Sequence, residues 1–544
     1  MVIERKLFRV AGMAAAILLG LLLADRNGSN VPAALAADRT VRIVSCRIEE
    51  SEVVCEIEAD RVPSSDDGIF YLYADEVYED GPDGKVVGEA EAAETAEVRF
   101  PLHYNTADSN LSRKFLVAMQ RHGRMEQVSD EHYITNPEDL APYAAERMDS
   151  GIKGILPDLE SVVEGDLEDL GIQQVVYNMC VDDLCADSSV PGAVSFFYNG
   201  QTWYFDEEKI RHYDDMIRTY NAMDVQVTMV LLNRGDGQFS QDLIHPRAFG
   251  ASCPGYALNV EEPGATAHLK AIGAFLGQRY CGASDHGQID NWILGNEVNA
   301  RTEWWYTDSD SLDFNTNIYV KAFRIIYNEM KAVNSSFRIY NSIDQEWNRK
   351  SNPGSFLARD YLDRFNYWIR REGNIDWGLS YHPYNSPLTD PYAWNGPAKW
   401  VGSTLSTPYI TMQNLDILID YIHRPEFLNP EGEVRSISLA EIGFTSAFGE
   451  EKQAASIAYG YLKAASLPDV DAFMLFRMTD HEQEMESKLY LGIKDIDGNR
   501  KMGYETYKYL GTPDDAEVKA KASEIIGMDI DQMIAEKIVW TREE

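Results

Sequence analysis

Residues 291–299 read Asn-Trp-Ile-Leu-Gly-Asn-Glu-Val-Asn, an apolar run that stops at a glycine and is followed at once by an Asn-Glu pair. A short apolar run that ends at a turn residue is typical of a buried strand. A strand that stops this abruptly would place Asn296 and Glu297 at the rim of a sheet, where a carboxylate can meet a ligand. The surrounding chain decides whether Glu297 has a partner there.

Strand-like and helix-like segments alternate on both sides of this run. That alternation is typical of an α/β protein with a parallel sheet. The eight predicted strands occupy residues 151–155, 173–177, 225–232, 289–294, 337–343, 377–381, 436–440 and 472–476. Eight strand–helix units predict a (β/α)8 TIM barrel, which we assign to residues 150–512 as the catalytic domain.

The two ends of the chain differ from this pattern. Residues 37–136 hold short β-rich runs separated by turn signals such as Asp80-Gly81 and Asp83-Gly84, which predict a small all-β, sandwich-like domain before the barrel. It could be a spacer, a carbohydrate-binding module or a structural cap, and we favour a cap or spacer because its aromatic residues are no denser than a core requires. Residues 513–544 predict a charged, helical C-terminal tail.

The N-terminus is typical of a targeting segment. Arg5, Lys6 and Arg9 precede an apolar stretch, residues 10–24, that is short for a membrane span, and Ala34-Leu35-Ala36 offers a small-residue cleavage pattern. We predict a signal peptide in residues 1–36, with an uncleaved anchor as the alternative. The mature protein is then expected to be secreted or at the cell surface, with no membrane association after cleavage.

The composition limits the partners. The formal net charge is −39, with 88 acidic against 49 basic residues, and such a surface repels nucleic acid and anionic lipid. Neutral or cationic ligands are favoured instead. The charge is spread along the chain, so it identifies no substrate, and the oligomeric state stays open.

Six cysteines fall into three local pairs, which suit disulfides in an exported protein: Cys46 with Cys55, Cys180 with Cys185, and Cys253 with Cys281. The alternative is a zinc site, but no pair has CxxC spacing and no histidine stands beside one. The Asp-rich residues 308–313 show no ordered calcium-ligand spacing. We therefore predict neither a metal nor a cofactor.

Active-site residues of such a barrel lie where its strands end. The polar residues at the predicted strand ends are Asn178, Asn233, Asn296, Glu297, Tyr340, Asn341, His382, Tyr384, Glu441 and Arg477. Glu297 and Glu441 are the prominent carboxylates, after strands four and seven, on opposite sides of the mouth. Two opposed carboxylates are the minimum apparatus for cleaving a glycosidic bond, because one protonates the leaving oxygen while the other attacks the anomeric carbon.

The Gly295-Asn296-Glu297 motif and the Ala440-Glu441-Ile442-Gly443 motif resemble clan A of the glycoside hydrolases, which are retaining (β/α)8 enzymes. The chain also resembles a poorly characterised group of exported bacterial proteins with such a barrel. The resemblance covers roughly residues 150 to 510. It implies that Glu297 is the general acid/base and Glu441 the nucleophile, that Asn296 binds the sugar 2-hydroxyl, and that Tyr384 keeps Glu441 ionised.

The sequence departs from that clan at strand eight, where many members place a tryptophan under the sugar and this chain reads Phe476-Arg477-Met478. Arg477 is expected either to bind a substrate carboxylate, as in a uronic acid, or to pair with Asp480 or Glu482.

Sugar stacking could instead come from Trp304 or Trp305, in the loop just after Glu297. His382 is a candidate substrate ligand or part of a rigid His-Pro-Tyr turn. Asn233 and Asn341 are candidate substrate ligands that could equally cap or line the barrel.

The leading hypothesis is an exported retaining glycoside hydrolase that cleaves a poly- or oligosaccharide. The alternative is a non-catalytic glycan-binding barrel, favoured if Glu297 and Glu441 point apart by well over roughly 10 Å or are buried in salt bridges. A third hypothesis is a hydrolase that uses Asp344 or Glu346 with a metal.

Overall fold

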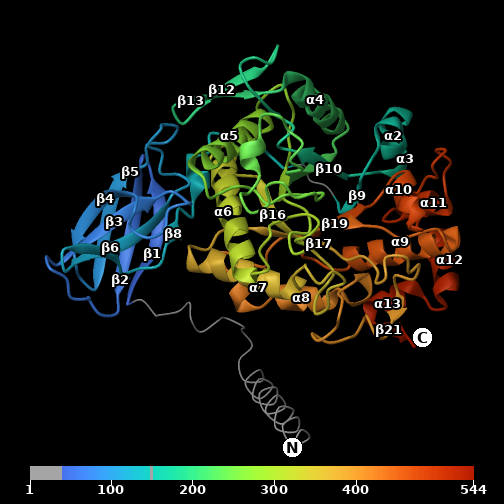
Figure 1. The fold of residues 1–544 in the computed structure, drawn as a ribbon. Helices are drawn as coiled ribbons and strands as arrows, with labels where there is room; N and C mark the ends of the chain where they lie inside the picture. The colour runs from blue at the N-terminus through green and yellow to red at the C-terminus, as the bar shows by residue number, and fades with distance from the viewer. Residues whose placement is uncertain (1–39, 148–150, 544) are drawn as a thin grey trace, which may run out of the picture.

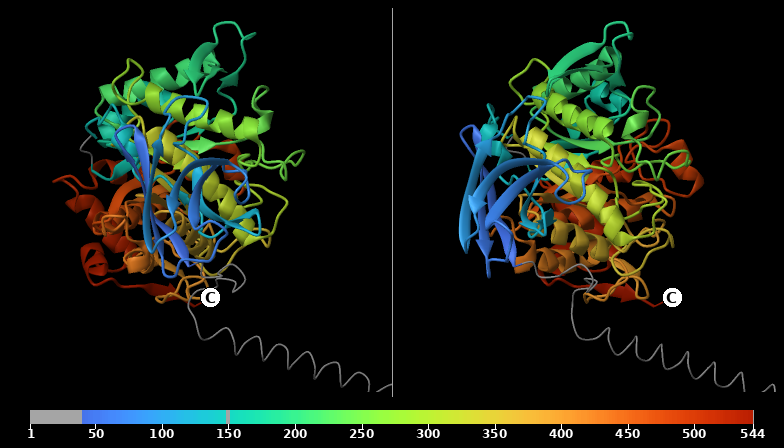
Figure 2. Two further views of the ribbon diagram at one scale, coloured as in Figure 1. Left: turned by 90° about the vertical axis from the view of Figure 1, so that its left-hand side faces the viewer. Right: turned by 60° about the vertical axis from the view of Figure 1, so that its left-hand side comes forward.

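The computed structural model describes residues 40–147 and 151–543. A small β-sheet region, blue in Figure 1, stands beside a larger body of alternating strands and helices, and Figure 2 shows it packed against one flank of that body. The predicted signal peptide, residues 1–36, lies outside the described residues. Within them, no helix is both long enough and apolar enough to cross a membrane.

Two antiparallel sheets form the N-terminal region. One has the order β1 (Val41–Glu49), β2 (Glu52–Ala59), β5 (Thr95–Pro101), and the other the order β4 (Lys85–Glu91), β3 (Ile69–Asp75), β6 (Lys114–Arg121), β7 (Arg124–Gln127), with β8 (His132–Tyr133) on β6. The alternation that marks a half-buried strand is clear in β5, where Val98 and Phe100 are buried and their neighbours are not. These side chains join one apolar core between the sheets, so the predicted all-β, sandwich-like region is confirmed.

Eight parallel strands close into a barrel, which confirms the predicted fold class. In chain order they are β9 (Lys153–Ile155), β10 (Gln174–Cys180), β14 (Gln226–Leu232), β15 (Asn291–Leu294), β16 (Arg338–Asp344), β17 (Gly378–His382), β19 (Ile437–Ile442) and β20 (Val470–Leu475). The ring closes where β20 pairs with β9.

Side chains fill both sides of the barrel wall. Strand β14 is buried along its whole length, as expected of a strand with helices outside and packed side chains inside. A small inner cluster includes Val230, Ile293, Tyr340 and Met474, while a much larger cluster lies between the strands and the surrounding helices. The barrel is therefore a packed core whose open surface is at its strand ends.

Helices surround the barrel (Figure 1). They are α2 (Leu159–Glu164), α3 (Asp166–Leu170), α4 (Glu207–Ala222), α5 (Pro263–Arg279), α6 (Leu312–Lys331), α7 (Ala358–Arg371), α8 (Asp416–Ile422), α9 (Glu450–Ala465), α10 (Glu482–Glu486), α11 (Met502–Tyr509), α12 (Ala516–Ile526) and α13 (Ile530–Ala535). Local signals begin several of them. The Asp206 side chain accepts hydrogen bonds from two backbone N–H groups of α4, and Ser311 accepts one at the start of α6.

The C-terminal residues pack onto the barrel. Helices α12 and α13 contribute Val518, Ile526 and Met533 to the main apolar core. The last strand, β21 (Trp540–Arg542), pairs with β18 (Asn395–Pro397) in the loop after β17. A further small sheet, β11 (Cys185–Ala186), β13 (Gln201–Phe205) and β12 (Val194–Tyr198), is inserted between β10 and α4. Residues 513–543 are thus part of the folded body.

The sandwich is joined to helices α6 and α7 by buried polar contacts. On α6, the Asn328 side chain donates a 2.9 Å hydrogen bond to the carbonyl of Leu111, and Glu329 accepts one of 2.8 Å from Ser112. After α7, the carbonyl of Glu372 accepts a 2.8 Å bond from the Tyr133 amide. These contacts fix the sandwich on the flank of the barrel.

Candidate active site

The turn after β15 aims Glu297 into the barrel mouth. Gly295 has φ +73° and Glu297 has φ +39°, a left-handed conformation that non-glycine residues seldom adopt. The next strand holds the turn, because the Glu297 amide donates to the Ser342 hydroxyl over 3.0 Å and the Val298 amide donates to the Ser342 carbonyl over 2.9 Å. A left-handed residue fixed by its neighbours is common at functional sites.

Glu441 is set by an irregularity in β19. The pairing register of β19 with β20 shifts between Leu439 and Ile442. Ala440 faces the barrel interior and Ile442 the outer core, and Glu441 between them reaches the cavity at the mouth. A bulge of this kind re-aims a side chain without ending the strand.

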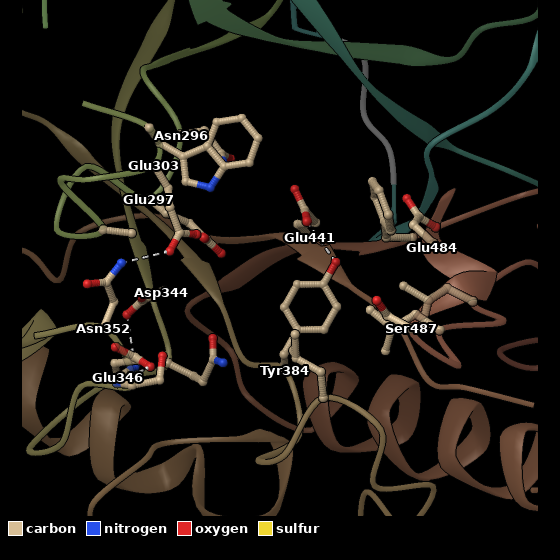
Figure 3. Close-up of a pocket in the computed structure, with 18 of the residues that line it drawn as sticks. Asn296, Glu297, Glu303, Asp344, Glu346, Asn352, Tyr384, Glu441, Glu484 and Ser487 are labelled. Atoms are coloured by element: carbon tan, nitrogen blue, oxygen red, sulfur yellow. Dashed lines mark hydrogen bonds between the residues drawn. The ribbon is translucent and has the colours of Figure 1, made fainter. Parts of the chain in front are cut away.

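A cavity of about 810 Å³ at the strand ends is lined by both carboxylates. Figure 3 shows Glu441 with Tyr384 on one side and Glu297 on the other. The Tyr384 hydroxyl donates a 2.7 Å hydrogen bond to Glu441. His382 Nδ1 lies 3.0 Å from Glu297 Oε1, and its ring is within electrostatic reach of Glu441. The structure therefore brings Glu297, Glu441, His382 and Tyr384 together.

The two carboxyl groups have different surroundings. Burial raises the pKa of Glu297 to about 8, and the negative charges of Glu303 and Glu346 act in the same direction. Burial also raises the pKa of Glu441, but the charge of His382 and the hydrogen bond from Tyr384 oppose that rise. A protonated acid beside a carboxylate with a donor is the arrangement that glycosidic cleavage needs.

His382 contributes shape more than charge. Its side chain is buried, and burial lowers the pKa of the imidazole despite the opposing charge of Glu441. The ring is therefore neutral near pH 7 and can exchange a hydrogen bond with Glu297 without forming an ion pair.

Of the remaining candidates, Asn296 and Trp304 line the cavity. Phe476 also lines it, at the end of the eighth strand, where an aromatic platform was in question. The Trp304 indole hydrogen-bonds the Glu297 carboxylate, which moderates the rise in its pKa.

Trp305 does not have the role predicted from the sequence, and the prediction is wrong. It is buried, its ring packs edge-on against Tyr319 at 5.0 Å between centroids, and it does not line the cavity. Adjacent residues in this loop point in opposite directions, so only Trp304 is left to form a binding wall.

Arg477 is a second correction. It pairs with Glu484 at 3.0 Å, which is neither of the two acidic partners proposed from the sequence, and it does not line the cavity. A guanidinium that is already paired beside the wall gives no support to a uronic-acid ligand.

The predicted ligands Asn233 and Asn341 also lie away from the cavity lining. The Asn233 side chain donates a 3.1 Å hydrogen bond to the carbonyl of Leu243 and so ties down its own loop. Asn341 is buried on β16, where alternate residues face opposite sides of the wall. Tyr340 faces inward, so Asn341 faces the helices.

Several residues line the cavity that were not predicted from the sequence: Arg234, Glu303, Asn352, His481 and Glu484. All are in loops, and their sequence neighbourhoods contain no motif that would single them out. Asp344 and Glu346, considered as rival carboxylates, line the same cavity. In the part of the chain that the structure describes, Arg234 is the one Lys or Arg side chain in the lining.

The cysteines do not form the predicted disulfides. All six lie within the described residues and are free thiols. The Sγ atoms of Cys46 and Cys55, a cross-strand pair in the sandwich, are 3.1 Å apart. Cys253 and Cys281 each hydrogen-bond a nearby backbone carbonyl, of Gly255 and Gln278 respectively. Cys185 does the same with Val181.

Over residues 40–147 and 151–543, no group of three or more His, Cys, Asp or Glu side chains has the arrangement to hold a metal ion. The hypothesis of a metal-dependent hydrolase at Asp344 or Glu346 gains no support from this geometry.

The sequence of the barrel matches a known protein family. A model described as a family of unknown function, DUF5722, matches residues 145–533. The chain belongs to this family. The matched segment contains every strand of the barrel and begins after the sandwich. A search of curated proteins finds no match.

Three solved structures illustrate the similarity. A family 39 glycoside hydrolase from Bacteroides cellulosilyticus WH2 is 14% identical, with 84% of this chain and 79% of that one covered and a TM-score of 0.46. A GH5_18 protein from Bifidobacterium longum is 13% identical, with 66% and 79% covered and a TM-score of 0.42. A glucosidase from Croceicoccus marinus is 14% identical, with 68% and 69% covered and a TM-score of 0.41.

Proposed function

We propose that this protein is an exported retaining glycoside hydrolase that cleaves a poly- or oligosaccharide by double displacement. The observation that carries the proposal is the pair Glu297 and Glu441, which come from the fourth and seventh strands and line one cavity in different electrostatic surroundings. Export rests on the basic and apolar sequence of residues 1–36.

In the first step, Glu297 donates its proton to the glycosidic oxygen while Glu441 attacks the anomeric carbon. The C–O bond to the leaving group breaks, and a covalent glycosyl ester forms on Glu441. The raised pKa of Glu297 keeps the acid protonated near neutral pH. The Tyr384 hydroxyl bonds Glu441 and helps to keep the nucleophile ionised.

In the second step, Glu297 acts as a base. It takes a proton from water, and the resulting hydroxide attacks the anomeric carbon and releases Glu441. Asn296, which lines the cavity beside Glu297, is the proposed partner of the sugar 2-hydroxyl. Retention requires the two carboxyl groups to be roughly 5 to 5.5 Å apart. Phe476 and Trp304 supply the aromatic faces that the sugar rings would contact.

The decisive experiment is a Glu441→Ala variant assayed beside the wild type on a panel of poly- and oligosaccharides. We expect the wild type to hydrolyse at least one glycan and the variant to lose the activity. A 2-deoxy-2-fluoro glycoside of the same sugar should label the wild type at Glu441, as intact mass and peptide mapping would reveal. Undiminished hydrolysis by the variant would rule out the mechanism.

A non-catalytic glycan-binding barrel is the competing function. The hydrogen-bonded neighbours of the two carboxylates, Tyr384 for Glu441 and the neutral His382 for Glu297, are not cations. Burial in a salt bridge, the arrangement that would favour binding alone, is thus not what these contacts form. Tight glycan binding without turnover across the panel would favour this alternative.

A further inference from the structure

The side of the cavity that holds Glu297 carries two more buried carboxyl groups. Figure 3 shows Asp344 and Glu346 gathered on this side, across the cavity from Glu441 and Tyr384. The proposed mechanism uses neither of them. Because the acid protonates the leaving group, this is the leaving-group side of the proposed site.

Glu346 is held rigidly. Its Oε1 accepts a 2.8 Å hydrogen bond from the Ser351 amide, and its own amide donates to Asp344 Oδ1 over 2.8 Å. Its carbonyl accepts a 2.9 Å bond from Ala358, the first residue of α7. The side chain is 7% exposed, so its charge is fixed in place beside the cavity instead of swinging into solvent.

Asp344 connects Glu346 to the turn that carries Glu297. Asn299 and Asp344 exchange two hydrogen bonds, from Asn299 Nδ2 to Asp344 Oδ1 over 2.8 Å and from the Asp344 amide to Asn299 Oδ1 over 3.0 Å. Asn299 is two residues after Glu297. A displacement of Glu346 would therefore be felt directly at the acid.

Several groups face Glu297 from the elements around it: Glu303 and Trp304 from its own loop, Asp344 and Glu346 from β16 and the loop after it, His382 and Tyr384 from β17 and the loop after it, and Glu441 from β19. Glu303 is exposed, and Asn352 approaches it at 3.4 Å, whereas Glu346 is buried. A buried charge is screened less by water and salt than an exposed one. Burial and the charges of Glu297 and Glu346 raise the pKa of Asp344 well above its usual range, so Asp344 stays neutral.

We propose that Glu346 is a positioning residue for the acid: its fixed carboxylate, held by Ser351 and Asp344, is the partner charge that keeps the proton on Glu297 at neutral pH. The inference rests on the proposed function, since it assigns Glu297 the role of acid. It adds a residue from the fifth strand–helix loop to a reaction that otherwise needs only strands four, six and seven.

The test is the Glu346→Gln variant. The amide oxygen of glutamine can still accept from the Ser351 amide, so the shape is kept while the charge is removed. We expect the basic limb of the kcat/KM profile to move to lower pH by about half a unit or more, with the acidic limb unchanged. A merely structural role would lower activity at all pH values without moving the limb.

Two matched variants make the result specific. Glu484→Gln carries the same substitution into the same cavity on the Glu441 side, and it should leave the basic limb where it is. Asp344→Asn replaces a neutral acid by a neutral amide, so it should move the limb less than Glu346→Gln does. A shift in Asp344→Asn as large as that in Glu346→Gln would overturn the assignment to Glu346.

A second readout separates this inference from the proposed function. The titration of Glu297 can be followed without turnover by ¹³C NMR of protein labelled at the glutamate carboxyl carbons, with Glu297→Gln identifying the resonance. A lower pKa of Glu297 in Glu346→Gln supports the inference even if no glycan is hydrolysed. An unchanged pKa in a folded variant overturns it even if the wild type proves to be a hydrolase.

Discussion

At the scale of single residues, Glu297 and Glu441 should divide the pH profile between them. Glu297 must be protonated in the free enzyme, so kcat/KM should fall as the pH rises through about 8. Glu441 must be ionised, and since its pKa is raised, activity should fall on the acid side at a pH above the usual carboxyl range. A kcat/KM profile from about pH 4 to about pH 10 checks both limbs, and activity still rising at about pH 9 would contradict the assignment.

Stability provides the control for that profile. The pKa of Glu297 is about 8 in the folded protein against 4.5 for an ordinary glutamate, so the folded state holds this proton more tightly than the unfolded state. Its contribution to stability is complete below about pH 4.5 and is lost as the pH rises through about 8. Thermal melts should therefore show Glu297→Gln gaining stability relative to wild type as the pH is raised.

The Tyr384→Phe substitution tests the nucleophile side. It removes a 2.7 Å hydrogen bond to Glu441, and a bond to a charged group is worth about 1.5 to 3 kcal/mol. We expect kcat/KM to fall by about 10- to 100-fold and the acidic limb to move to higher pH.

The matched control for Tyr384 is Tyr381→Phe. That variant loses a 3.0 Å hydrogen bond to the carbonyl of Ile410, away from Glu441. It should lower the melting temperature and leave the acidic limb in place. Equal shifts in the two variants would mean that the limb does not report on Glu441.

At the scale of elements, the strands and their order could be predicted because each buried strand leaves a short apolar run and each strand end a polar residue. Which polar residue faces the cavity could not. Alternation along β16 turns Asn341 outward while Asp344 lines the cavity, and the register shift in β19 turns Glu441 inward beside Ala440. Glu303 and Glu484 reach the cavity through the course of their loops, which depends on tertiary packing.

The turn after β15 has its own prediction. A Cβ on Gly295 would stand 2.8 Å from Val298 Cγ1 in a backbone with φ +73°, so Gly295→Ala should be strained on two counts. Gly432 has φ +83° and nothing within 4 Å, so Gly432→Ala is the matched control for backbone strain alone. We expect Gly295→Ala to lose more stability in thermal melts, by about 1 kcal/mol or more, and to reduce kcat through displacement of Glu297. Equal losses in the two variants would contradict the crowding at Val298 as the cause.

At the scale of the whole molecule, charge should select the substrate. The chain carries a net charge of −39, and the cavity lining combines Glu303, Glu346 and Glu484 with a single guanidinium, Arg234, among the described residues. A negative potential in a cleft repels an anionic ligand, and salt screens it over about 10 Å at 0.1 M. Calorimetric titrations should therefore show weaker binding of an oligogalacturonate than of a neutral oligosaccharide of equal length, with the difference narrowing as salt is added. Tighter binding of the oligogalacturonate at low salt would contradict this.

The buried seam between the sandwich and α6 bears on where this protein can be cut. The family match begins at residue 145, yet Glu329 of the barrel is 1% exposed and takes one of its hydrogen bonds from Ser112, on the other side of that boundary. A fragment that starts at 145 would expose this carboxyl group and the apolar surface around Ala332 to water. We expect it to melt at a lower temperature and to aggregate at concentrations at which residues 40–543 stay monodisperse, as light scattering would show. The unit of sequence relatedness is in this case smaller than the unit of folding, and a shortened form of the protein should keep the sandwich together with the barrel.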